Sequence, residues 1–243
     1  MEQQYDELWP GTRFVRGGSG FPLGTDAVLL ADFSARGQVR RFADLGCGAG
    51  VILILLAQAY PRAEGFGIEL QAKAAETARE NAALNGVYDR CEIRCGDLRL
   101  NEELPEAGAF DLVAANPPYF PVGSGYSAPE DSRRAAREER FCTLDDICRA
   151  AARLTRWGGR FCIVHRPERL SELFVTMTKH GLEPKRLRAV CRMAGDAPSL
   201  VLAEAQRGAK PGLTIEKPLA LYDADGKESD ECKRIYRTKE QEA

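Results

Sequence analysis

The sequence predicts an α/β fold in which a mostly parallel, seven-stranded sheet is covered by helices on both faces. The central part of the chain alternates short β-type runs with helical runs, the pattern of strand–helix–strand units in a parallel sheet. A glycine-rich turn directly follows the first of these strands. The last two strands are joined only by the short segment Met193–Ser199, too short for a crossover helix, so we expect the final strand to be antiparallel.

Seven runs read as strands because they are apolar, short and bounded by turn residues. In chain order they are Arg41–Leu45, Ala63–Ile68, Cys91–Arg94, Phe110–Ala115, Arg160–His165, Lys185–Arg192 and Leu200–Ala205. The helices predicted between them are Val51–Tyr60, Gln71–Leu84, Leu144–Arg156 and Leu170–His180. Each helix is followed by a residue type that ends helices, namely Pro61, Asn85-Gly86, Gly158-Gly159 and Gly181.

Shorter elements are expected at both ends of the chain. Trp9–Arg16 reads as a hairpin strand, and Thr25 as the N-cap of a helix over Asp26–Ser34. A strand at Ala220–Tyr222 and a charged helix at Ser229–Tyr236 follow the sheet. We therefore predict an N-terminal extension over 1–36 that packs on the core, a main domain over 37–208, and a short C-terminal extension over 209–243.

Composition excludes several classes of protein. Of the 243 residues, 44% are hydrophobic and 29% are charged, values typical of a globular chain, which excludes disorder throughout. The eight cysteines show no CxxC pair, so we expect reduced thiols, no disulfide framework and no metal site. The start lacks the pattern of a secretory signal, and the longest apolar run, Val51–Ala57, is far too short for a membrane span. A cytoplasmic protein without membrane contact is expected.

The charges are unevenly distributed along the chain. The formal net charge is −2, which argues against a broad basic coat for nucleic acid. Counted by segment, residues 1–119 carry a net charge of −6, and residues 120–200 carry +5. The segment counts leave room for a local basic face.

A cofactor-binding loop is predicted at Asp44–Gly50, between the first strand of the sheet and the helix that follows. Its glycines at Gly46, Gly48 and Gly50 allow a sharp turn and close approach of a ligand to the main chain. Taken alone, such a loop also fits a simple tight turn. The context strengthens the cofactor interpretation, because Glu69 and Asp97 end the next two strands at the same edge of the sheet.

The charges of this edge favour one cofactor class over another. The third glycine comes one residue early for a dinucleotide loop, and the Asp44 carboxylate would repel a pyrophosphate. S-adenosylmethionine carries a sulfonium and an ammonium group and no phosphate, so it suits an acidic site. Glu69 can accept from ribose hydroxyls, and Asp97 from the adenine amino group.

The tetrapeptide Asn116-Pro117-Pro118-Tyr119 follows the fourth strand. By itself it fits a proline-rich turn. In a chain that also contains the predicted cofactor loop, it predicts catalysis on a planar amine. The Asn116 side-chain oxygen and the Pro117 carbonyl can accept the two N–H bonds of such an amine, and Tyr119 offers a ring for stacking. The amine attacks a sulfonium methyl without a strong base, so His165 and His180 are expected to be structural.

Asp44–Gly50 together with Asn116–Tyr119 resembles the class I S-adenosylmethionine-dependent methyltransferases that modify planar amide or amino nitrogens, which have a Rossmann-like fold. Branches of that group methylate adenine in DNA, glutamine in peptide release factors, or adenine in RNA. Only 43 residues precede Asp44, and they do not read as the helical substrate domain of the release-factor branch. The short C-terminal part leaves no room for the target-recognition domain of the DNA branch.

Three further segments resemble the valine-tRNA adenine-N6 methyltransferase family: Phe21–Ala31, Arg134–Glu138 and Arg166–Leu170. The resemblance implies methyl transfer to the exocyclic N6 of adenine 37 in tRNA, and it implies that Thr25 and Asp26 lie near the methionine end of the cofactor. Two alternatives stay open. One is a protein-glutamine N5 methyltransferase acting on a release factor or ribosomal protein, and the other is a non-catalytic module that binds S-adenosylmethionine or RNA.

Basic residues directly after the tetrapeptide are the candidates for RNA contact. Arg133, Arg134 and Arg137 could contact phosphates around a flipped base, with Arg140 in the same run. Interleaved glutamates also fit the start of a solvated helix; for the cluster we favour binding. Arg166 and Arg169 are further candidates, unless they pair with Glu168 or Glu172.

Overall fold

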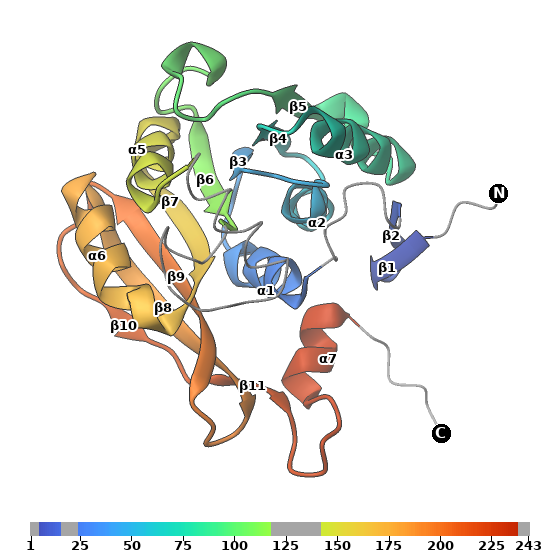
Figure 1. The fold of residues 1–243 in the computed structure, drawn as a ribbon, viewed down its shortest axis with the longest axis vertical. Helices are drawn as coiled ribbons and strands as arrows, with labels where there is room; N and C mark the ends of the chain where they lie inside the picture. The colour runs from blue at the N-terminus through green and yellow to red at the C-terminus, as the bar shows by residue number, and fades with distance from the viewer. Residues whose placement is uncertain (1–4, 16–23, 118–141, 238–243) are drawn as a thin grey trace, which may run out of the picture.

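A computed structural model describes residues 5–15, 24–117 and 142–237 of the chain, shown as a ribbon in Figure 1. These residues form a nine-stranded sheet with helices on both faces and a separate two-stranded hairpin. The predicted Rossmann-like α/β class is confirmed.

The sheet contains all seven predicted strands in a mostly parallel arrangement. Its strands are β3 (Arg41–Leu45), β4 (Glu64–Glu69), β5 (Cys91–Cys95), β6 (Phe110–Ala115), β7 (Thr155–His165), β8 (Leu182–Met193), β9 (Pro198–Arg207), β10 (Thr214–Ile215) and β11 (Leu219–Tyr222). The order across the sheet is β10-β8-β9-β7-β6-β3-β4-β5, and β11 also pairs with β8. Strand β9 lies antiparallel between β7 and β8, as the short connection before it predicts. The short edge strands β10 and β11 raise the number of strands from seven to nine.

The central strands are buried on both faces, and their side chains alternate between two separate hydrophobic clusters. In β6, Leu112 and Ala114 belong to one cluster, whereas Val113 and Ala115 belong to the other. This follows from the two-residue period of a strand, which sends successive side chains to opposite faces. Sheets covered on both sides therefore show continuous apolar runs, which is the pattern seen in these strands.

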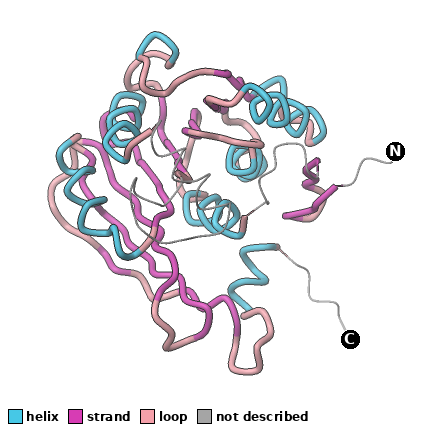
Figure 2. Tube along the Cα trace, in the orientation of Figure 1, coloured by secondary structure: helices cyan, strands magenta, loops and turns pink. Residues whose placement is uncertain are grey.

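The helices divide between these two faces, as the views in Figures 1 and 2 show. On one face lie α1 (Thr25–Ser34), α2 (Val51–Ala59) and α3 (Ala72–Leu84), and on the other lie α5 (Leu144–Leu154) and α6 (Leu170–Lys179). The last helix is α7 (Asp230–Tyr236), and short 3-10 turns occur at Tyr88–Arg90, Asn101–Glu103 and Pro167–Arg169. Within the described ranges no helix combines the length and the apolar character needed to cross a membrane.

The N-terminal hairpin consists of β1 (Tyr5–Trp9) and β2 (Thr12–Val15). The predicted hairpin is confirmed, but the bounds predicted for its strand, Trp9–Arg16, are wrong: Trp9 ends the first strand, and the chain turns at Gly11 with a φ of 80°. The Trp9 indole nitrogen donates to the Ile235 carbonyl at 2.9 Å, which joins the hairpin to α7.

Two helix ends differ from the prediction. Helix α1 includes Thr25 and has Gly24 at its N-cap position with no side-chain cap, so the predicted Thr25 cap is wrong. Helix α5 ends at Leu154 rather than Arg156, because the Thr155 hydroxyl donates to the Ala151 carbonyl at 2.7 Å and Thr155 already pairs with Phe110 in the sheet. The predicted division of the chain at residues 36 and 208 stays a prediction. Helix α1, from the predicted N-terminal extension, packs in the same hydrophobic cluster as α2 of the main domain.

Candidate active site

Four predicted site residues belong to one edge of the sheet. Strands β3, β4, β5 and β6 are parallel, so their carboxyl ends meet at that edge. Asp44 lies near the end of β3, Glu69 ends β4, Asp97 comes just after β5, and Asn116 directly follows β6. Ligands of open α/β sheets bind at this edge, and the topology brings the predicted residues to it.

The glycine loop between β3 and α2 requires glycine for two different reasons. Gly46, Gly48 and Gly50 have φ values of 72°, 52° and 84°, in the left-handed region that side chains disfavour. A Cβ at Gly46 or Gly48 would meet no atom within 4 Å, so open space adjoins the loop there. A Cβ at Gly50 would lie 3.2 Å from the Ala78 Cβ, so this glycine allows α2 to approach α3.

Asp44 is a buried carboxyl with one oxygen unsatisfied. Its side chain is 1% exposed, and Oδ2 accepts from the Leu53 amide at 3.1 Å, while Oδ1 is buried without a hydrogen-bond partner. Burial raises the pKa of Asp44 to about 7; the Leu53 amide opposes this shift, and the nearby Glu69 charge adds to it. A buried acceptor of this kind gains free energy from a cationic or N–H donor, which is what an ammonium-bearing ligand offers.

Glu69 connects the glycine loop to the next helix. Its Oε2 accepts from the Gly48 amide and its Oε1 from the Gln71 amide, both at 2.9 Å. Each carboxylate oxygen keeps a second acceptor site, so contact with ribose hydroxyls stays a prediction compatible with this geometry. The sequence signal for the bond to Gln71 is a carboxylate two residues before a helix begins.

Asn81 also positions the loop, and sequence reasoning missed it. This residue of α3 is fully buried, and its Nδ2 donates to the Ala49 carbonyl at 2.9 Å, while its Oδ1 accepts from Val15 at 2.8 Å. The available signal was an asparagine among the alanines of the apolar stripe of α3. Buried amides need such partners, so this one ties the glycine loop to the hairpin.

Asp97 has a cationic partner close in sequence. The Arg99 Nε lies 2.9 Å from both carboxylate oxygens of Asp97. The hydrogen bonds from Arg99 hold the pKa of Asp97 below its usual value, against the opposing effect of partial burial. The predicted contact of Asp97 with an adenine amino group would therefore be shared with Arg99, a neighbour that the motif-based prediction did not include.

The remaining predicted site residues are only partly described. Asn116 is half-buried and Pro117 is buried at the end of β6. Thr25, exposed in the first turn of α1, is hydrogen-bonded to Tyr236, and Asp26 follows it. Helix α1 ends beside Arg160 at the opposite edge of the sheet, so its first turn lies toward the carboxyl edge. Predicted residues outside the described part are Tyr119, Arg133, Arg134 and Arg137.

The two histidines have structural partners. Burial lowers the pKa of His165 to about 4, so the ring is neutral at pH 7, and its Nδ1 accepts from the Arg166 amide at 2.9 Å. His180 lies 3.0 Å from the Asp145 carboxylate, which joins α6 to α5.

The basic residues after β7 also pair within the protein. Arg169 pairs with Glu172 through two hydrogen bonds of 2.8 Å, so the pairing alternative predicted for Arg169 is the one observed. The Arg166 Nη1 donates to the Ser199 carbonyl at 3.0 Å. All eight cysteines are free thiols. In the part of the chain that the structure describes, no three His, Cys, Asp or Glu side chains converge as metal ligands would.

Residues 21–179 match the model of the methyltransferase small domain family. The chain belongs to the methyltransferase small domain family. This methyltransferase is 34% identical over 193 residues to a curated Porphyromonas gingivalis protein named tRNA1(Val) (adenine(37)-N6)-methyltransferase, which covers 77% of this chain and 75% of the relative. It is 29% identical over 209 residues to an Aeromonas hydrophila protein of the same name, covering 86% and 85% of the two chains.

Solved structures share the fold of this methyltransferase. A predicted O-methyltransferase from Agrobacterium tumefaciens superposes with a TM-score of 0.71 at 22% identity, covering 88% of this chain and 96% of that one. A geranyl diphosphate C-methyltransferase from Streptomyces coelicolor, solved with S-adenosyl-L-homocysteine, gives a TM-score of 0.54 at 15% identity, covering 85% and 90%. At these identities the likeness concerns the fold, and it confirms the class that the sequence predicts.

Proposed function

We propose that this methyltransferase transfers a methyl group from S-adenosylmethionine to the exocyclic N6 amine of an adenine in RNA. The substrate class is tRNA, and the target is adenine 37 of valine tRNA. The observation that carries this proposal is the meeting of Asn116-Pro117 with the unsatisfied Asp44 carboxyl and the open glycine loop at one edge of the sheet. The names of the curated relatives support the choice of substrate.

The carboxyl-edge residues fit S-adenosylmethionine, which supplies an electrophilic methyl group on a sulfonium. The buried Asp44 Oδ1 is an acceptor suited to the cationic end of that molecule, and the space beside Gly46 and Gly48 admits it against the main chain. Glu69 accepts from ribose hydroxyls, and Asp97 accepts from the adenine amine while it remains paired with Arg99. Thr25 and Asp26, in the first turn of α1, contact the methionine end.

Asn116 and Pro117 orient the acceptor amine. An adenine amine is a weak nucleophile because its lone pair is delocalised into the ring. Two acceptors, the Asn116 side-chain oxygen and the Pro117 carbonyl, bind its two N–H bonds and favour a more tetrahedral nitrogen. The fixed φ of proline holds its carbonyl in place, so the geometry is preorganised. The amine nitrogen then bonds to the methyl carbon as the carbon–sulfur bond breaks, and the surplus proton leaves to water.

Tyr119 and three arginines complete the substrate side of the proposal. Tyr119 stacks on the target base once that base is turned out from its neighbours in the RNA loop. Arg133, Arg134 and Arg137 contact phosphates on either side of that base. They belong to the segment that carries the positive charge of the chain.

Transfer of labelled methyl groups to a valine tRNA transcript, followed by nucleoside analysis, tests the proposal. N6-methyladenosine should form on the transcript with adenosine at position 37 and not on one with guanosine there. The Asn116→Ala variant should lose transfer, while Asn101→Ala, at an exposed position outside the site, should retain it.

A release factor assayed in parallel separates the alternatives. Methylglutamine on the release factor, with unmodified tRNA, would replace the proposal with the protein-methylating alternative. Binding of the cofactor without turnover on either substrate would favour a non-catalytic module.

A further inference from the structure

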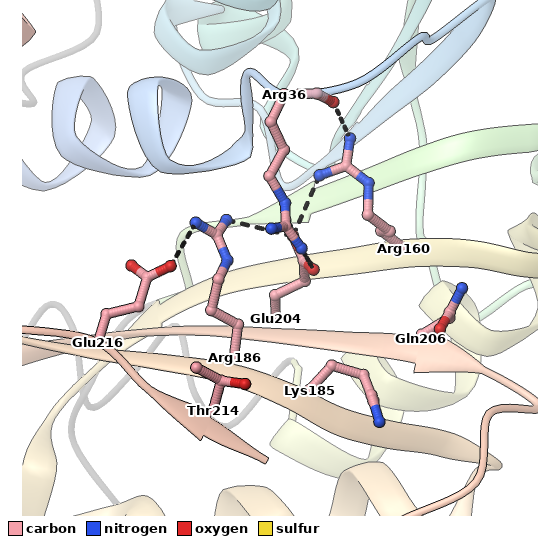
Figure 3. A pocket seen from close by; sticks show the side chains of 8 residues that line it. All are labelled: Arg36, Arg160, Lys185, Arg186, Glu204, Gln206, Thr214 and Glu216. Carbon is pink, nitrogen blue, oxygen red and sulfur yellow. Dashed lines mark hydrogen bonds and ion pairs between the residues drawn. The ribbon is translucent and has the colours of Figure 1, made fainter. Parts of the chain in front are cut away.

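A basic pocket lies near the amino ends of the parallel strands, whereas the candidate active site lies at their carboxyl ends. Its volume is about 330 Å³, and it is bounded by the segment after α1 and by β7, β8, β9 and β10 (Figure 3). Arg160 in its wall pairs with Leu112 near the start of β6, whereas Asn116 follows the end of that strand. The two positions are four residues apart, about 13 Å at the rise of a strand, so the pocket is separate from the methyl-transfer site.

The lining of the pocket is positively charged. Four basic side chains face two carboxylates there: Arg36, Arg160, Lys185 and Arg186 against Glu204 and Glu216. Glu204 is 2% exposed and accepts hydrogen bonds from all three arginines, as the dashed lines in Figure 3 indicate. One buried carboxylate cannot balance three guanidinium groups, and Glu216, 3.1 Å from the Arg186 Nη1, balances one more. With Lys185 included, a net charge of two positive units remains.

Glu204 stays ionised in this setting. Burial raises the pKa of its carboxyl, but the hydrogen bond from Arg36 and the charges of Arg160 and Arg186 outweigh that effect, so the pKa lies below its usual value. The Glu204 carboxylate therefore remains the charged centre around which the three arginines gather.

Part of this basic cluster has a structural role. Arg160 donates to the Ser34 and Arg36 carbonyls, and Arg186 donates to the Phe33 carbonyl, so both satisfy main-chain oxygens where α1 ends. This capping role explains why Arg160 lies in the pocket wall.

The side chains of Arg36 and Lys185 take no part in capping the helix. The Arg186 Nε is buried away from solvent, whereas the Arg36 side chain, whose Nε donates to Glu204, is 48% exposed. The Lys185 Nζ donates to the main-chain carbonyl of Lys210 at 3.1 Å, and no side chain in the described ranges pairs with it. Capping of α1 therefore does not explain why two further cationic side chains, Arg36 and Lys185, line this cavity.

An exposed tryptophan lies next to the pocket. Gln206, which lines the pocket, donates to the Gly158 carbonyl at 2.9 Å, and Trp157 directly precedes Gly158. The Trp157 side chain is 73% exposed, and its ring covers Gly208, where a Cβ would come within 2.3 Å of the indole. Exposed aromatic rings beside basic groups are typical of surfaces on which a nucleobase stacks.

We propose that this pocket binds the phosphate group of a nucleotide, either free or within RNA. A phosphate carries up to two negative charges and tetrahedral oxygens that accept from several directions, which matches the charge excess of the pocket and the separate side chains of Arg36 and Lys185. The volume exceeds that of phosphate alone and leaves room for an attached sugar. The base of the same or an adjacent nucleotide then stacks on Trp157.

Calorimetric titration with uridine 5′-monophosphate tests the site directly, since this probe lacks adenine and avoids the proposed cofactor site. The wild type should bind it more tightly than uridine, and the affinity should fall with added salt. Lys185→Gln should weaken binding by about ten- to a hundredfold, the usual effect of losing one charged hydrogen bond. Arg62→Gln, which removes an exposed arginine from the turn between α2 and β4, should bind as the wild type does.

A second measurement distinguishes the two sources of phosphate. If the pocket contacts RNA, Lys185→Gln should weaken tRNA binding and reduce the slope of log affinity against log salt by about one, while Arg62→Gln should not. If it binds a free nucleotide, the variant should lose uridine monophosphate and keep the tRNA affinity. Equal binding of both probes by Lys185→Gln and Arg62→Gln, with unchanged thermal stability, would overturn the inference. Neither measurement depends on methyl transfer, so failure here leaves the proposed function standing.

Discussion

The buried carboxyl of Asp44 should make the stability of the ligand-free methyltransferase fall as the pH rises. The informative perturbation is Asp44→Asn, which keeps the shape of the side chain and removes its ionisation. The Asp44 pKa rises from 3.8 to about 7 because burial disfavours the charged form. The folded chain therefore holds this proton more tightly than the unfolded chain does.

The sign and size of the effect follow from that difference. Between pH 3.8 and about 7 the folded state carries more protons than the unfolded state, so the free energy of unfolding decreases as pH rises through this window. Over the whole window the loss is about 4 kcal/mol, and between pH 5 and 8 about 3 kcal/mol. In Asp44→Asn this component is absent. The buried amide adds a cost of about 1–3 kcal/mol that is independent of pH.

Urea denaturation of both proteins at pH 5 and pH 8, without cofactor, measures this. Relative to wild type, the free energy of unfolding of Asp44→Asn should rise by about 3 kcal/mol from the lower to the higher pH. The matched control is Asp89→Asn, at an exposed carboxylate in the turn after α3, which should follow the wild-type profile. Parallel profiles for wild type and Asp44→Asn would refute the reasoning, because the buried carboxyl would then titrate as it does in water.

Three further predictions concern catalysis, substrate binding and the loop. Asn116→Ala should abolish methyl transfer while calorimetry shows cofactor affinity within about twofold of wild type, because the side chain acts on the amine. Tyr119→Ala should raise the KM for tRNA by an amount equivalent to about 1–3 kcal/mol in steady-state assays, and Tyr119→Phe should not. Gly50→Ala should lower the free energy of unfolding in urea by about 1–3 kcal/mol, because its φ is 84° and the Ala78 Cβ would be 3.2 Å away.

Each of these has an outcome that contradicts it. Full transfer by Asn116→Ala would show that the proposed acceptor is dispensable, and equal KM values for the alanine and phenylalanine variants of Tyr119 would argue against stacking. For the loop, Gly86→Ala is a control with positive φ, 65°, and no atom within 4 Å of the new Cβ. Equal destabilisation by Gly50→Ala and Gly86→Ala would mean that contact with Ala78 adds nothing to the backbone cost.

The Asp97–Arg99 pair changes the expectation for cofactor recognition. The sequence motif placed a lone carboxylate after β5, whereas the structure places a guanidinium against both of its oxygens. The Arg99 side chain of this pair is open to solvent, so the pair contributes little to stability and a ligand can share or displace it at small cost. Arg99 is therefore a neighbour that any account of adenine recognition in this protein must include.

The sequence by itself determined the strand order along the chain, the antiparallel direction of β9 and the edge at which the candidate site lies. These features depend on apolar periodicity, turn residues and connection length, which are local properties of the chain. The same local signals misplaced the first turn of α1 and the end of α5. Those boundaries depend on long-range pairing, as when Thr155 joins Phe110 in the sheet.

Only the tertiary structure decided which polar groups meet. It left one oxygen of Asp44 buried without a partner and bonded Glu69 to the Gly48 amide. It also gathered arginines from three separate parts of the chain around Glu204. Burial and pairing of this kind depend on distances between residues far apart in sequence, and those distances exist only once the two faces of the sheet are packed. The residue types at the site could therefore be predicted from the chain, but their ionisation and their partners could not.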